Sequence, residues 1–542
     1  MVAAPLLSLA TTNHEAEVYR DSIRQIEVDS NQFINGFHGA IGNSIWAQSI
    51  GDDTGYLSIY GNHFAYDATD NLNALIQLNS LNFDSVNVSC NTVTPNFTEL
   101  NGINYLPPAT STFIETTNTW NTDNCKTPTS NTYYVTPDAL NTGTGAKTCP
   151  WVLDTAVVKA MAGDIVYVLA GDYGAKTLTF PNSGTANAPI YFIGCTDFPT
   201  TNEAGKTNIS INFPLTSFEH FKNDEISNYS NVMPLLNGIT RENIALKIGN
   251  RSYLNIQNFA ITKYHTGIQS AVAGVASEHI TLKNIIGSDF ANTRSSGCGC
   301  EEIRSGCPQK LGYGLEIYGN HHRIDSCIIA DASAYNIAVW GSYNEIKNCR
   351  TYGTKGKVDD LFDPTDYYIE IGGYNNVIGT GTTVNNCIAV REDGMTDLCH
   401  KGKGIGIKRG QKNTITNCTT TDLDNEGFYA FGLTTTGNIF KNCQTNDDNR
   451  DGNALAIREG ANKNSFINCT INDAGIGVRF KRDGGGHQNL FLNCYFNRPK
   501  VHVQIDKYAG CSVWTNCTIY ADCETCEEKS KLNNNLINAE SR

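Results

Sequence analysis

Short runs of alternating apolar and polar residues, separated by turns rich in Gly and Asn, recur along most of this 542-residue chain after residue 130. One copy, GIGIKRGQKNTITNCTTTDLDNEG (residues 404–427), contains a first alternating run, a polar turn, a second run that ends in Asn-Cys, and another polar turn. Side chains alternate between the two faces of a strand, so runs of this length bounded by Gly and Asn predict β-strands.

A Cys follows the second run of most copies, and the intervals between these Cys residues give the length of each copy. The segments IDSCIIAD, IKNCRTYG, VNNCIAVR, ITNCTTTD, FKNCQTND, FINCTIND, FLNCYFNR and WTNCTIYA place it at Cys327, Cys349, Cys387, Cys418, Cys443, Cys469, Cys494 and Cys517. Upstream, IQNFAIT and LKNIIGS repeat the context with Phe259 and Ile285 in the Cys position. Repeats of about 25 residues indicate stacked structural units. Two or three short strands in each coil predict an all-β fold, a right-handed parallel β-helix, with the longer intervals inserted as loops on one face.

The 19 Cys residues admit several chemical interpretations. The eight Cys of the repeat are expected to be buried, reduced thiols that fill the solenoid core, although strands about 4.8 Å apart also allow disulfides between coils. The Asn before each Cys is expected to form an amide ladder. Outside the repeat, loop disulfides are favoured over a zinc site, which needs paired CxxC units or added His. This applies to two loop groups, one with Cys298, Cys300 and Cys307 and the other with Cys523 and Cys526.

The first coils follow an apolar segment with helical spacing. We predict a helix over Trp151–Met161, with Pro150 before it, and strands at Ile165–Leu169, Thr177–Phe180 and Ile190–Ile193. Such a helix shields the open end of a solenoid from edge pairing. The predicted organisation is therefore a β-helix over residues 131–520 with an N-terminal capping helix, and a C-terminal tail over 521–542.

Residues 1–130 are rich in Asn, Thr and Ser and contain no cluster of catalytic residue types. A helix is expected around Glu15–Gln32, and alternating stretches such as YLSIYG and LNFDSVNVS follow it. We interpret this region as a separate attachment or assembly module.

The segment from Tyr133 to Ile190, with the order YYV…PW…A…AGDIVYVLAGDY…NSGTANAPI, resembles the start of pectate-lyase-like β-helix proteins. The pattern is most similar to polysaccharide lyases of family nine and to related surface or tail-spike proteins. Together with the Asn-Cys coils, the resemblance covers residues 131–520. It implies the β-helix fold and, for the chemistry, cleavage of an acidic polysaccharide.

The charge balance excludes some classes of partner. The chain has 40 Lys and Arg against 54 Asp and Glu, a net charge of −14, and no basic run. Nucleic-acid affinity comes from cations that neutralise phosphates, so no nucleic-acid partner is expected.

No stretch reaches the roughly 18 apolar residues that a membrane span needs. The apolar start lacks a basic region before it and is a weak secretion signal.

Aligning the first strand of successive coils predicts two columns of side chains on the outer face. The first column contains Glu316, Ala338, Glu370, Gly406, Tyr429, Ala456, Gly477 and His502. The second contains Tyr318, Trp340, Gly372, Lys408, Phe431, Arg458, Arg479 and Gln504.

This outer face combines aromatic and cationic residues. Trp340, Tyr429 and Phe431 are expected to be exposed rings on which sugars stack, with Tyr318 and Glu370 as further substrate contacts. Three cations, Lys408, Arg458 and Arg479, fall in the second column, the two Arg on consecutive coils. One interpretation is a binding surface for an acidic polysaccharide or cell-surface glycan, and the other is a solvated face with incidental aromatic residues.

Acidic turns flank the columns. Family-nine lyases hold calcium with an Asp-Gly-Phe turn and, one coil later, an Asp-Asp-x-x-Asp group. The matching residues here are Glu426 in Glu426-Gly427-Phe428 and then Asp447, Asp448 and Asp451. The resemblance thus implies a Ca²⁺ site, although Glu replaces Asp. Solvated turn carboxylates are the alternative, and a second acidic loop carries Asp359, Asp360 and Asp363.

The reaction that the resemblance implies is β-elimination on a uronic acid. Calcium or Arg neutralises the substrate carboxylate, and a Lys kept neutral by nearby positive charge removes a proton. Lys481 and Lys408 are the candidate bases, and Arg458 and Arg479 are the candidate neutralising groups. Hydrolysis is less favoured, because the outer columns hold Glu316 and Glu370 but no Asp pair.

Three functions remain open. The chain is an extracellular polysaccharide lyase, a glycan-binding adhesin or phage tail-spike protein without turnover, or a purely structural solenoid. A homotrimer located at a cell surface or on a virion would fit the tail-spike alternative.

Overall fold

The structure is a computed structural model. It describes the backbone of strands between Leu7 and Thr116, and then residues 131–539 with gaps. The gaps are 140–142, 199–224, 242, 271–276, 291–311, 355–364, 392–401, 424, 447–451, 482–485, 487, 498, 500, 506–511, 516 and 521–536. Contacts divide the chain into two compact units, Met1–Ala156 and Val157–Arg542.

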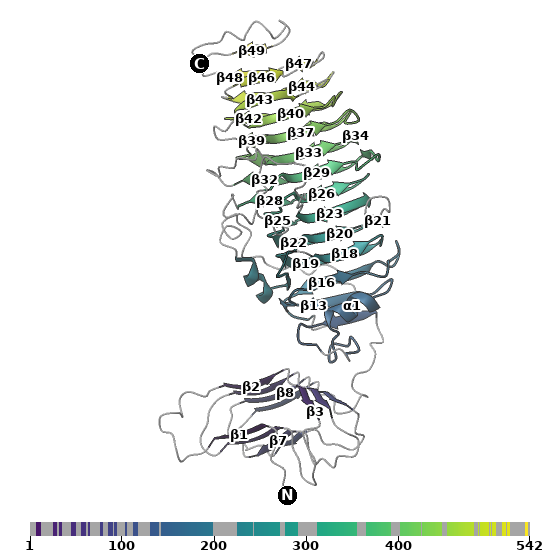
Figure 1. Cartoon of the computed structure of the whole chain (residues 1–542), viewed down its shortest axis with the longest axis vertical. Helices are drawn as coiled ribbons and strands as arrows, with labels where there is room; N and C mark the ends of the chain where they lie inside the picture. The colour runs from purple at the N-terminus through teal and green to yellow at the C-terminus, as the bar shows by residue number, and fades with distance from the viewer. Residues whose placement is uncertain are drawn as a thin grey trace, which may run out of the picture. The chain divides into compact units, whose positions relative to one another are not determined.

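The second unit is a parallel β-helix, which confirms the predicted fold. A representative coil contains β33 (Lys403–Lys408), β34 (Gly410–Gln411), β35 (Thr414–Thr416) and β36 (Thr419–Thr421), after which β37 (Glu426–Phe431) lies beside β33. The paired strands of successive coils are parallel, and they rise in chain order from β13 to β48 (Figure 1).

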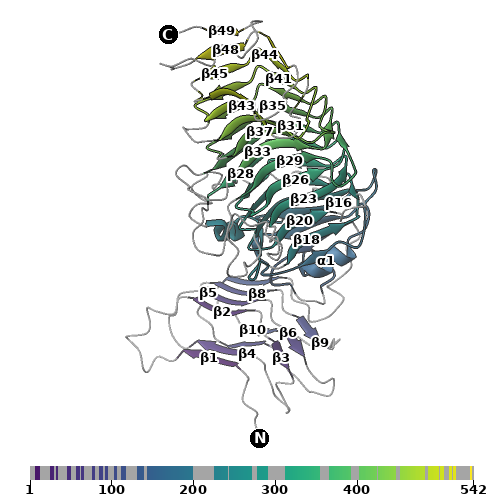
Figure 2. The same cartoon turned by 45° about the horizontal axis from the view of Figure 1, so that its top comes forward.

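One face of the β-helix, here called the front sheet, is built from the first strand of each coil (Figure 2). Its other strands, in order, are β15 (Leu178–Thr179), β18 (Ile244–Gly249), β20 (Thr266–Ser270), β23 (Tyr313–Asn320), β26 (Tyr335–Trp340), β29 (Tyr367–Gly372), β40 (Asn453–Arg458), β43 (Ile476–Lys481) and β46 (Val501–Ile505). A short strand, β21 (Ser277–Glu278), pairs with β23 at the side of this sheet.

The remaining strands of the β-helix belong to one long sheet that turns a corner within each coil. Its early members are β12 (Thr132–Val135), β13 (Ile165–Leu169), β14 (Gly171–Asp172), β16 (Ile190–Cys195), β17 (Pro234–Asn237), β19 (Leu254–Thr262) and β22 (Thr281–Ser288). One later row contains β24 (Arg323–Asp325), β27 (Glu345–Lys347), β31 (Thr383–Asn385), β38 (Ile439–Lys441), β41 (Ser465–Ile467), β44 (Leu490–Leu492) and β47 (Val513–Thr515). The other contains β25 (Ile328–Ala330), β28 (Arg350–Gly353), β32 (Ile388–Arg391), β39 (Gln444–Asn446), β42 (Thr470–Asn472), β45 (Tyr495–Asn497) and β48 (Cys517–Tyr520). The pair β30 (Gly379–Thr380) and β34 forms a small separate ladder.

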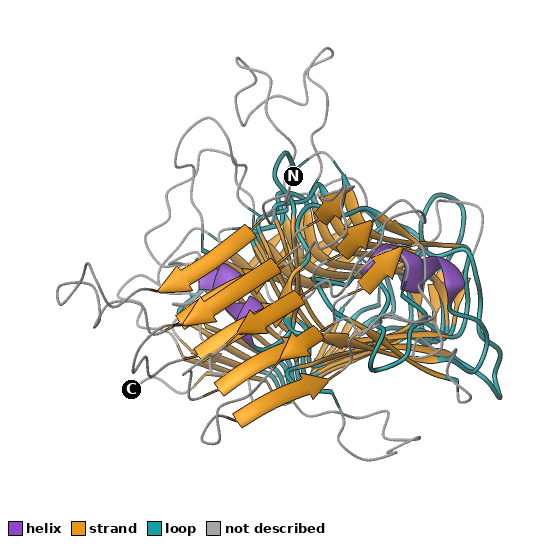
Figure 3. Cartoon of the chain, turned by 90° about the horizontal axis from the view of Figure 1, so that it is seen from below, coloured by secondary structure: helices purple, strands orange, loops and turns teal. Residues whose placement is uncertain are grey.

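The start of the β-helix follows the predicted order. Helix α1 covers Leu153–Lys159, slightly shorter than expected, and Asn182 Nδ2 donates to the carbonyl oxygens of Val158 and Ala160 at its end. Strand β13 has the predicted bounds. Within the described residues helix is confined to short segments (Figure 3), and no helix there is long and apolar enough to cross a membrane.

The described strands between Leu7 and Thr116, in the first unit, form three small parallel sheets. The first contains β1 (Leu7–Thr11), β4 (Ile45–Ser49), β7 (Ile76–Asn79) and β10 (Ile103–Tyr105). The second contains β2 (Gln25–Asp29), β5 (Tyr56–Tyr60), β8 (Ser85–Ser89) and β11 (Thr112–Thr116), and the third β3 (Gln32–Ile34), β6 (His63–Ala65) and β9 (Thr92–Thr94). The helix expected around Glu15–Gln32 is therefore wrong at Gln25–Asp29, which form β2. The residues QIEVD alternate between polar and apolar, as in a strand, and β2 pairs in parallel with β5.

Within the segment predicted as a C-terminal tail, strand β49 (Ile537–Ala539) pairs in parallel with β48 and adds a strand to the long sheet.

The thiols of the Cys ladder are buried and free, as predicted. Each lies near backbone carbonyls: Cys443 Sγ lies 3.6 Å from Ile415 O and 3.5 Å from Lys441 O, and either oxygen can accept its one hydrogen. The polar S–H groups are thus satisfied inside the coil. Of the other cysteines, Cys149 is disulfide-bonded, whereas the two predicted loop groups, Cys298 to Cys307 and Cys523 with Cys526, lie outside the described residues.

Asn precedes seven of the eight Cys of the repeat, Ser326 standing before Cys327, and in the described coils this Asn forms the predicted amide ladder at an exposed turn. Asn442 Nδ2, for example, donates to Asn417 Oδ1 at 3.2 Å, and Asn468 Nδ2 donates to Asn442 Oδ1 at 3.2 Å. The φ angles of these three residues lie between 52° and 54°, in the left-handed region that Asn tolerates better than most residues.

A second Asn ladder is buried and was not predicted. It contains Asn413, Asn438, Asn464 and Asn489, none of which is exposed to solvent. Asn438 Oδ1 accepts from both the backbone N and Nδ2 of Asn413, and the pattern repeats one coil on between Asn438 and Asn464.

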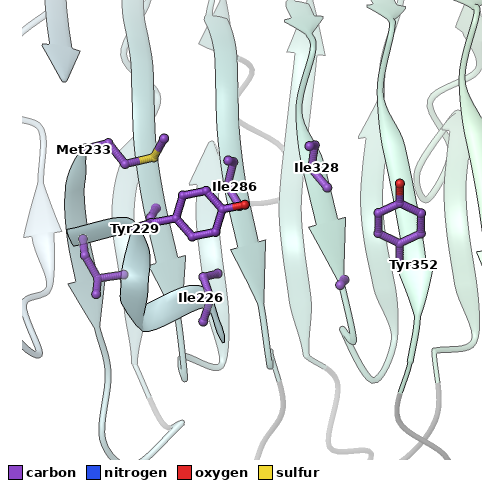
Figure 4. Close-up of a cluster of buried hydrophobic side chains, with 9 residues drawn as sticks. Ile226, Tyr229, Met233, Ile286, Ile328 and Tyr352 are labelled. Carbon is purple, nitrogen blue, oxygen red and sulfur yellow. The ribbon is translucent and has the colours of Figure 1, made fainter. Parts of the chain in front are cut away.

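The 3₁₀ helix η2 (Glu225–Asn231) packs on the side of the β-helix away from the front sheet. Ile226 and Tyr229 of η2 join Met233 in a buried cluster with Ile286, Ile328 and other residues of the long sheet (Figure 4). The cluster covers β17, β19 and β22 on this side of the β-helix, so we assign this face a structural role.

Candidate functional site

Three rows of side chains run up the outer surface of the front sheet, in register from coil to coil. Row A contains Tyr313, Tyr335, Tyr367, Lys403, Glu426 and Asn453. Row B contains Glu316, Ala338, Glu370, Gly406, Tyr429, Ala456 and Arg479. Row C contains Tyr318, Trp340, Gly372, Lys408, Phe431, Arg458 and Lys481.

Rows B and C correct the end of the predicted columns. Arg479 pairs with Ala456, and Lys481 pairs with Arg458. The expected column of consecutive arginines, Arg458 and Arg479, is therefore wrong. The shift of two residues also replaces Gly477 by Arg479 in row B, followed by Gln504 in place of His502.

Lys481 and Arg458 share one carboxylate oxygen. Lys481 Nζ lies 2.9 Å from Glu426 Oε1, and Arg458 Nη1 lies 3.0 Å from the same atom. Asn425 Oδ1 accepts a further hydrogen bond from Lys481 Nζ at 2.9 Å. The Glu426 side chain is fully buried, whereas those of Lys481 and Arg458 are 15% and 23% exposed. This ion cluster thus presents two cations to the surface above a buried anion.

The pKa of Lys481 is lowered from its ordinary value, and burial is the largest cause. The charge and hydrogen bond of Glu426 oppose this shift, while the positive charges of Arg458 and Arg479 add to it. A lysine in this environment gives up its proton more readily than a solvated one. It is thus suited to act as a base.

Glu370 occupies the centre of row B and anchors two aromatic side chains. Its Oε1 accepts from Trp340 Nε1 and its Oε2 accepts from Tyr429 Oη, both at 3.1 Å. Burial raises the pKa of Glu370, and the positive charge of Lys408 is the main opposing influence. Trp340 and Tyr429 are only 5% and 1% exposed, so the expectation that their rings are exposed for stacking is wrong. Their polar edges are used to hold Glu370.

Glu316 forms a similar arrangement nearer the N-terminal end. It accepts from Gln269 Nε2 at 2.7 Å and from Tyr318 Oη at 2.9 Å. Burial raises the pKa of this carboxyl as well. Tyr318, half-buried, also contacts the ring of the exposed Tyr374, with 5.1 Å between centroids.

Phe431 separates two cations of row C. Lys408 Nζ lies 5.2 Å from the centroid of the Phe431 ring and the Arg458 guanidinium carbon lies 5.0 Å from it. The ring face attracts both cations and keeps them in place on the surface. Lys408 is half-buried, so it can still meet an anionic ligand.

Of the predicted calcium ligands, only Glu426 belongs to the described residues. Asp447, Asp448 and Asp451 lie outside them, as do Asp359, Asp360 and Asp363 of the second loop. Glu426 Oε2 has no hydrogen-bond partner among the described residues, but Oε1 already carries two cations. A divalent ion on the same carboxylate would meet strong repulsion, so Glu426 does not fit a calcium ligand. The parts of the chain that the structure describes hold no group of three metal-ligating side chains.

Row A was missed by the sequence alignment. Strict alternation puts Tyr335 on the same side as Ile337, yet Asn336 and Ile337 are consecutive and both fully buried. The irregularity at the start of these strands turns Tyr335 outward, where its ring lies 5.5 Å from Trp340. The sequence did contain a signal for this row, because a tyrosine is the first residue of three successive strands of the front sheet: Tyr313, Tyr335 and Tyr367.

No family model and no curated protein matches this sequence. Solved structures that share a partial likeness include a mannuronic acid specific polysaccharide family 6 lyase from human gut microbiota, at 13% identity over 76% of this chain and 83% of that one, with a TM-score of 0.45. Others are the GH136 lacto-N-biosidase from Eubacterium ramulus (14% identity, 72% and 67% coverage, TM-score 0.45) and the pectate lyase Pel9A (13%, 71% and 78%, TM-score 0.33).

Proposed function

We propose that this protein binds an acidic polysaccharide on the outer surface of its front sheet and cleaves it by β-elimination, outside the cell. The observation that carries the proposal is the ion cluster of Lys481, Arg458 and Glu426. It supplies a lysine with a lowered pKa beside a guanidinium on the next strand.

In this mechanism Arg458 pairs with the carboxylate of a uronic acid residue. Neutralising that charge acidifies the C–H bond next to the carboxylate. The neutral amine of Lys481 takes this proton, the C–H electron pair forms the carbon–carbon double bond, and the bond to the glycosidic oxygen breaks. The departing oxygen takes a proton from water. Positioned base catalysis of this kind typically contributes a factor of about 10² to 10⁴ in rate.

Lys481 is preferred to Lys408 as the base because of its surroundings. Its side chain is largely buried, and the charges of two further cations, Arg458 and Arg479, act on its amine. Lys408 contacts the rings of Phe431 and Tyr367, a position that suits binding of a carboxylate. Calcium at the Asp447 group is a separate proposal, and no step above depends on it.

Binding without cleavage is the second candidate function. Lys481 donates to Glu426 Oε1 and to Asn425 Oδ1, which is the arrangement of a protonated amine. If a bound glycan leaves these bonds intact, the cluster recognises the carboxylate and no proton moves. This alternative includes the adhesin and the homotrimeric tail spike, and light scattering on the purified protein tests the trimer.

The experiment incubates the full chain with a panel of uronate polymers and follows the absorbance of the unsaturated product, with calcium or with chelator. We expect product on at least one polymer, and its loss in Lys481→Met but not in the control variant Lys441→Met, which alters an exposed lysine of β38. Binding without product on every polymer would reject the lyase and support the binding protein. Product that survives in Lys481→Met would reject the assignment of the base.

A further inference from the structure

The tyrosines of row A form a continuous stack beside the ion cluster. The ring centroids of Tyr313 and Tyr335 are 5.4 Å apart, and those of Tyr335 and Tyr367 are 4.5 Å apart, with interplanar angles of 3° and 8°. Lys403 Nζ lies 4.2 Å from the centroid of Tyr367 and covers the next face of the stack. The ring faces are therefore occupied by one another, and the ladder offers its edges and hydroxyl groups.

The three hydroxyl groups of the ladder make no hydrogen bond within the described part of the chain. The rings of Tyr313, Tyr335 and Tyr367 are half-buried, and the described residues supply no hydrogen-bond partner to their Oη atoms. By contrast, the hydroxyls of Tyr318 and Tyr429, in the neighbouring rows, are used by Glu316 and Glu370. A hydroxyl that is half-buried and unpaired gains from a polar ligand that restores its hydrogen bond.

Charge is divided between the two halves of the front sheet. Strands β23, β26 and β29, which carry the tyrosine ladder, contain Glu316 and Glu370 but no Lys or Arg. Strands β33, β37, β40 and β43 contain one acidic residue, Glu426, and five cations, Lys403, Lys408, Arg458, Arg479 and Lys481. A carboxylate is thus favoured over the second half, whereas the strands of the first half carry no Lys or Arg to pair with it.

We infer that Tyr313, Tyr335 and Tyr367 bind neutral sugar residues that adjoin the acidic residue held by the ion cluster. The substrate class is then a heteropolysaccharide in which a uronic acid is followed on one side by neutral sugars, rather than a uronate homopolymer. This inference rests on the proposed function, because it uses the same site for the acidic residue. It adds a specificity-determining row that the cations alone do not provide.

The spacing of the ladder suits such a chain. Adjacent strands lie about 4.8 Å apart, close to the length of one pyranose unit, so a glycan that runs along the β-helix places successive sugars over successive coils. Each neutral sugar then meets one tyrosine hydroxyl. Its own hydroxyl groups donate and accept without bringing a charge near Glu316 or Glu370.

The test compares binding and product formation on two kinds of probe. Polygalacturonate and alginate represent uronate homopolymers, while hyaluronan and gellan carry neutral sugars between uronates. We expect tighter binding of one of the mixed polymers. The variant Tyr335→Phe, which keeps the ring stack, is expected to weaken that binding about three- to tenfold, as the loss of one hydrogen bond does. It should leave homopolymer binding unchanged, and the matched control Tyr343→Phe, an exposed tyrosine of another turn, should change neither.

The outcomes separate this inference from the function on which it rests. If Arg458→Gln abolishes binding of every polymer while Tyr335→Phe affects none, the acidic site stands and the neutral row is rejected. Equal weakening of both polymer classes by Tyr335→Phe also rejects it. If the unmodified protein binds no polymer, the proposed function fails and the inference fails with it.

Discussion

Lys481 Nζ lies 2.9 Å from Glu426 Oε1, an oxygen of a carboxylate that is fully buried beneath the surface of the front sheet. The two residues are 55 positions apart in sequence, and the coil of β40 lies between their strands. Arg458 of that coil contacts the same oxygen. One buried anion therefore holds two cations at the surface, where burial, and to a smaller extent the charge of Arg458, lowers the pKa of Lys481.

The first prediction concerns the pH dependence that Glu426 sets. Glu426 raises the pKa of Lys481 while burial and Arg458 lower it. In Glu426→Gln the pKa of Lys481 should fall further, because the opposing charge is gone. Since the base must be neutral, the rise of kcat/KM with pH should then occur at lower pH than in the unmodified protein. Profiles of kcat/KM against pH measure this shift, Glu459→Gln on the exposed turn after β40 is the control, and an unmoved midpoint would contradict the coupling.

The second prediction separates the roles of the two lysines. Lys481→Met should lower kcat by about 10² or more while changing substrate affinity only a few-fold, because a base acts in the transition state. Lys408→Met should mainly weaken binding, since its ammonium lies over Phe431 and is placed to meet a carboxylate. Steady-state kinetics with calorimetric binding distinguish the two patterns. The reverse result, with Lys408 controlling kcat, would exchange the assignments.

The third prediction concerns stability and Glu370. Burial raises the pKa of this carboxyl in the folded state, whereas in the unfolded chain it has its ordinary value near 4.5. Above that value the unfolded state releases the proton first, so this group's contribution to stability is complete below pH 4.5 and is lost as pH rises through the folded pKa. Glu370→Gln cannot ionise. Its melting temperature should therefore fall less than that of the unmodified protein between pH 4.5 and neutrality.

Thermal unfolding at several pH values provides the measurement for Glu370. The variant Glu459→Gln, on the exposed turn after β40, is the control and should follow the unmodified protein. Parallel curves for Glu370→Gln and the unmodified protein would show that the buried carboxyl is ionised in both states. In that case Trp340 and Tyr429 donate to a carboxylate and not to an acid.

The repeat was predictable because it depends on local composition. Free Cys is a small apolar residue that fits a narrow solenoid core, and Cys443 and its equivalents recur at the same place in each coil. The site was less accessible to prediction. The outward position of Tyr335 depends on an irregularity at the start of its strand. The register of Lys481 depends on the turn before β43, whose length differs from that of the equivalent turns in other coils. Neither feature follows from the alternation of apolar and polar residues. That Trp340 is buried depends on its contact with Glu370, which comes from another coil.

The last prediction tests the buried Asn ladder, which also escaped the sequence analysis. Asn438 Oδ1 accepts from Asn413 N and Nδ2, and its Nδ2 donates to Gly410 O and to Asn464 Oδ1. Replacement by Ala leaves the buried Asn413 amide without its acceptor, at a cost of roughly 1 to 3 kcal/mol for each unsatisfied group. Asn438→Ala should therefore lower the free energy of unfolding by at least that amount. Asn442→Gly is the matched control from the exposed ladder, where water replaces the lost bonds and glycine accepts the positive φ. Denaturant unfolding measures the free energy of unfolding of both variants. An equal loss in the two would mean that burial does not increase the contribution of the inner ladder to stability.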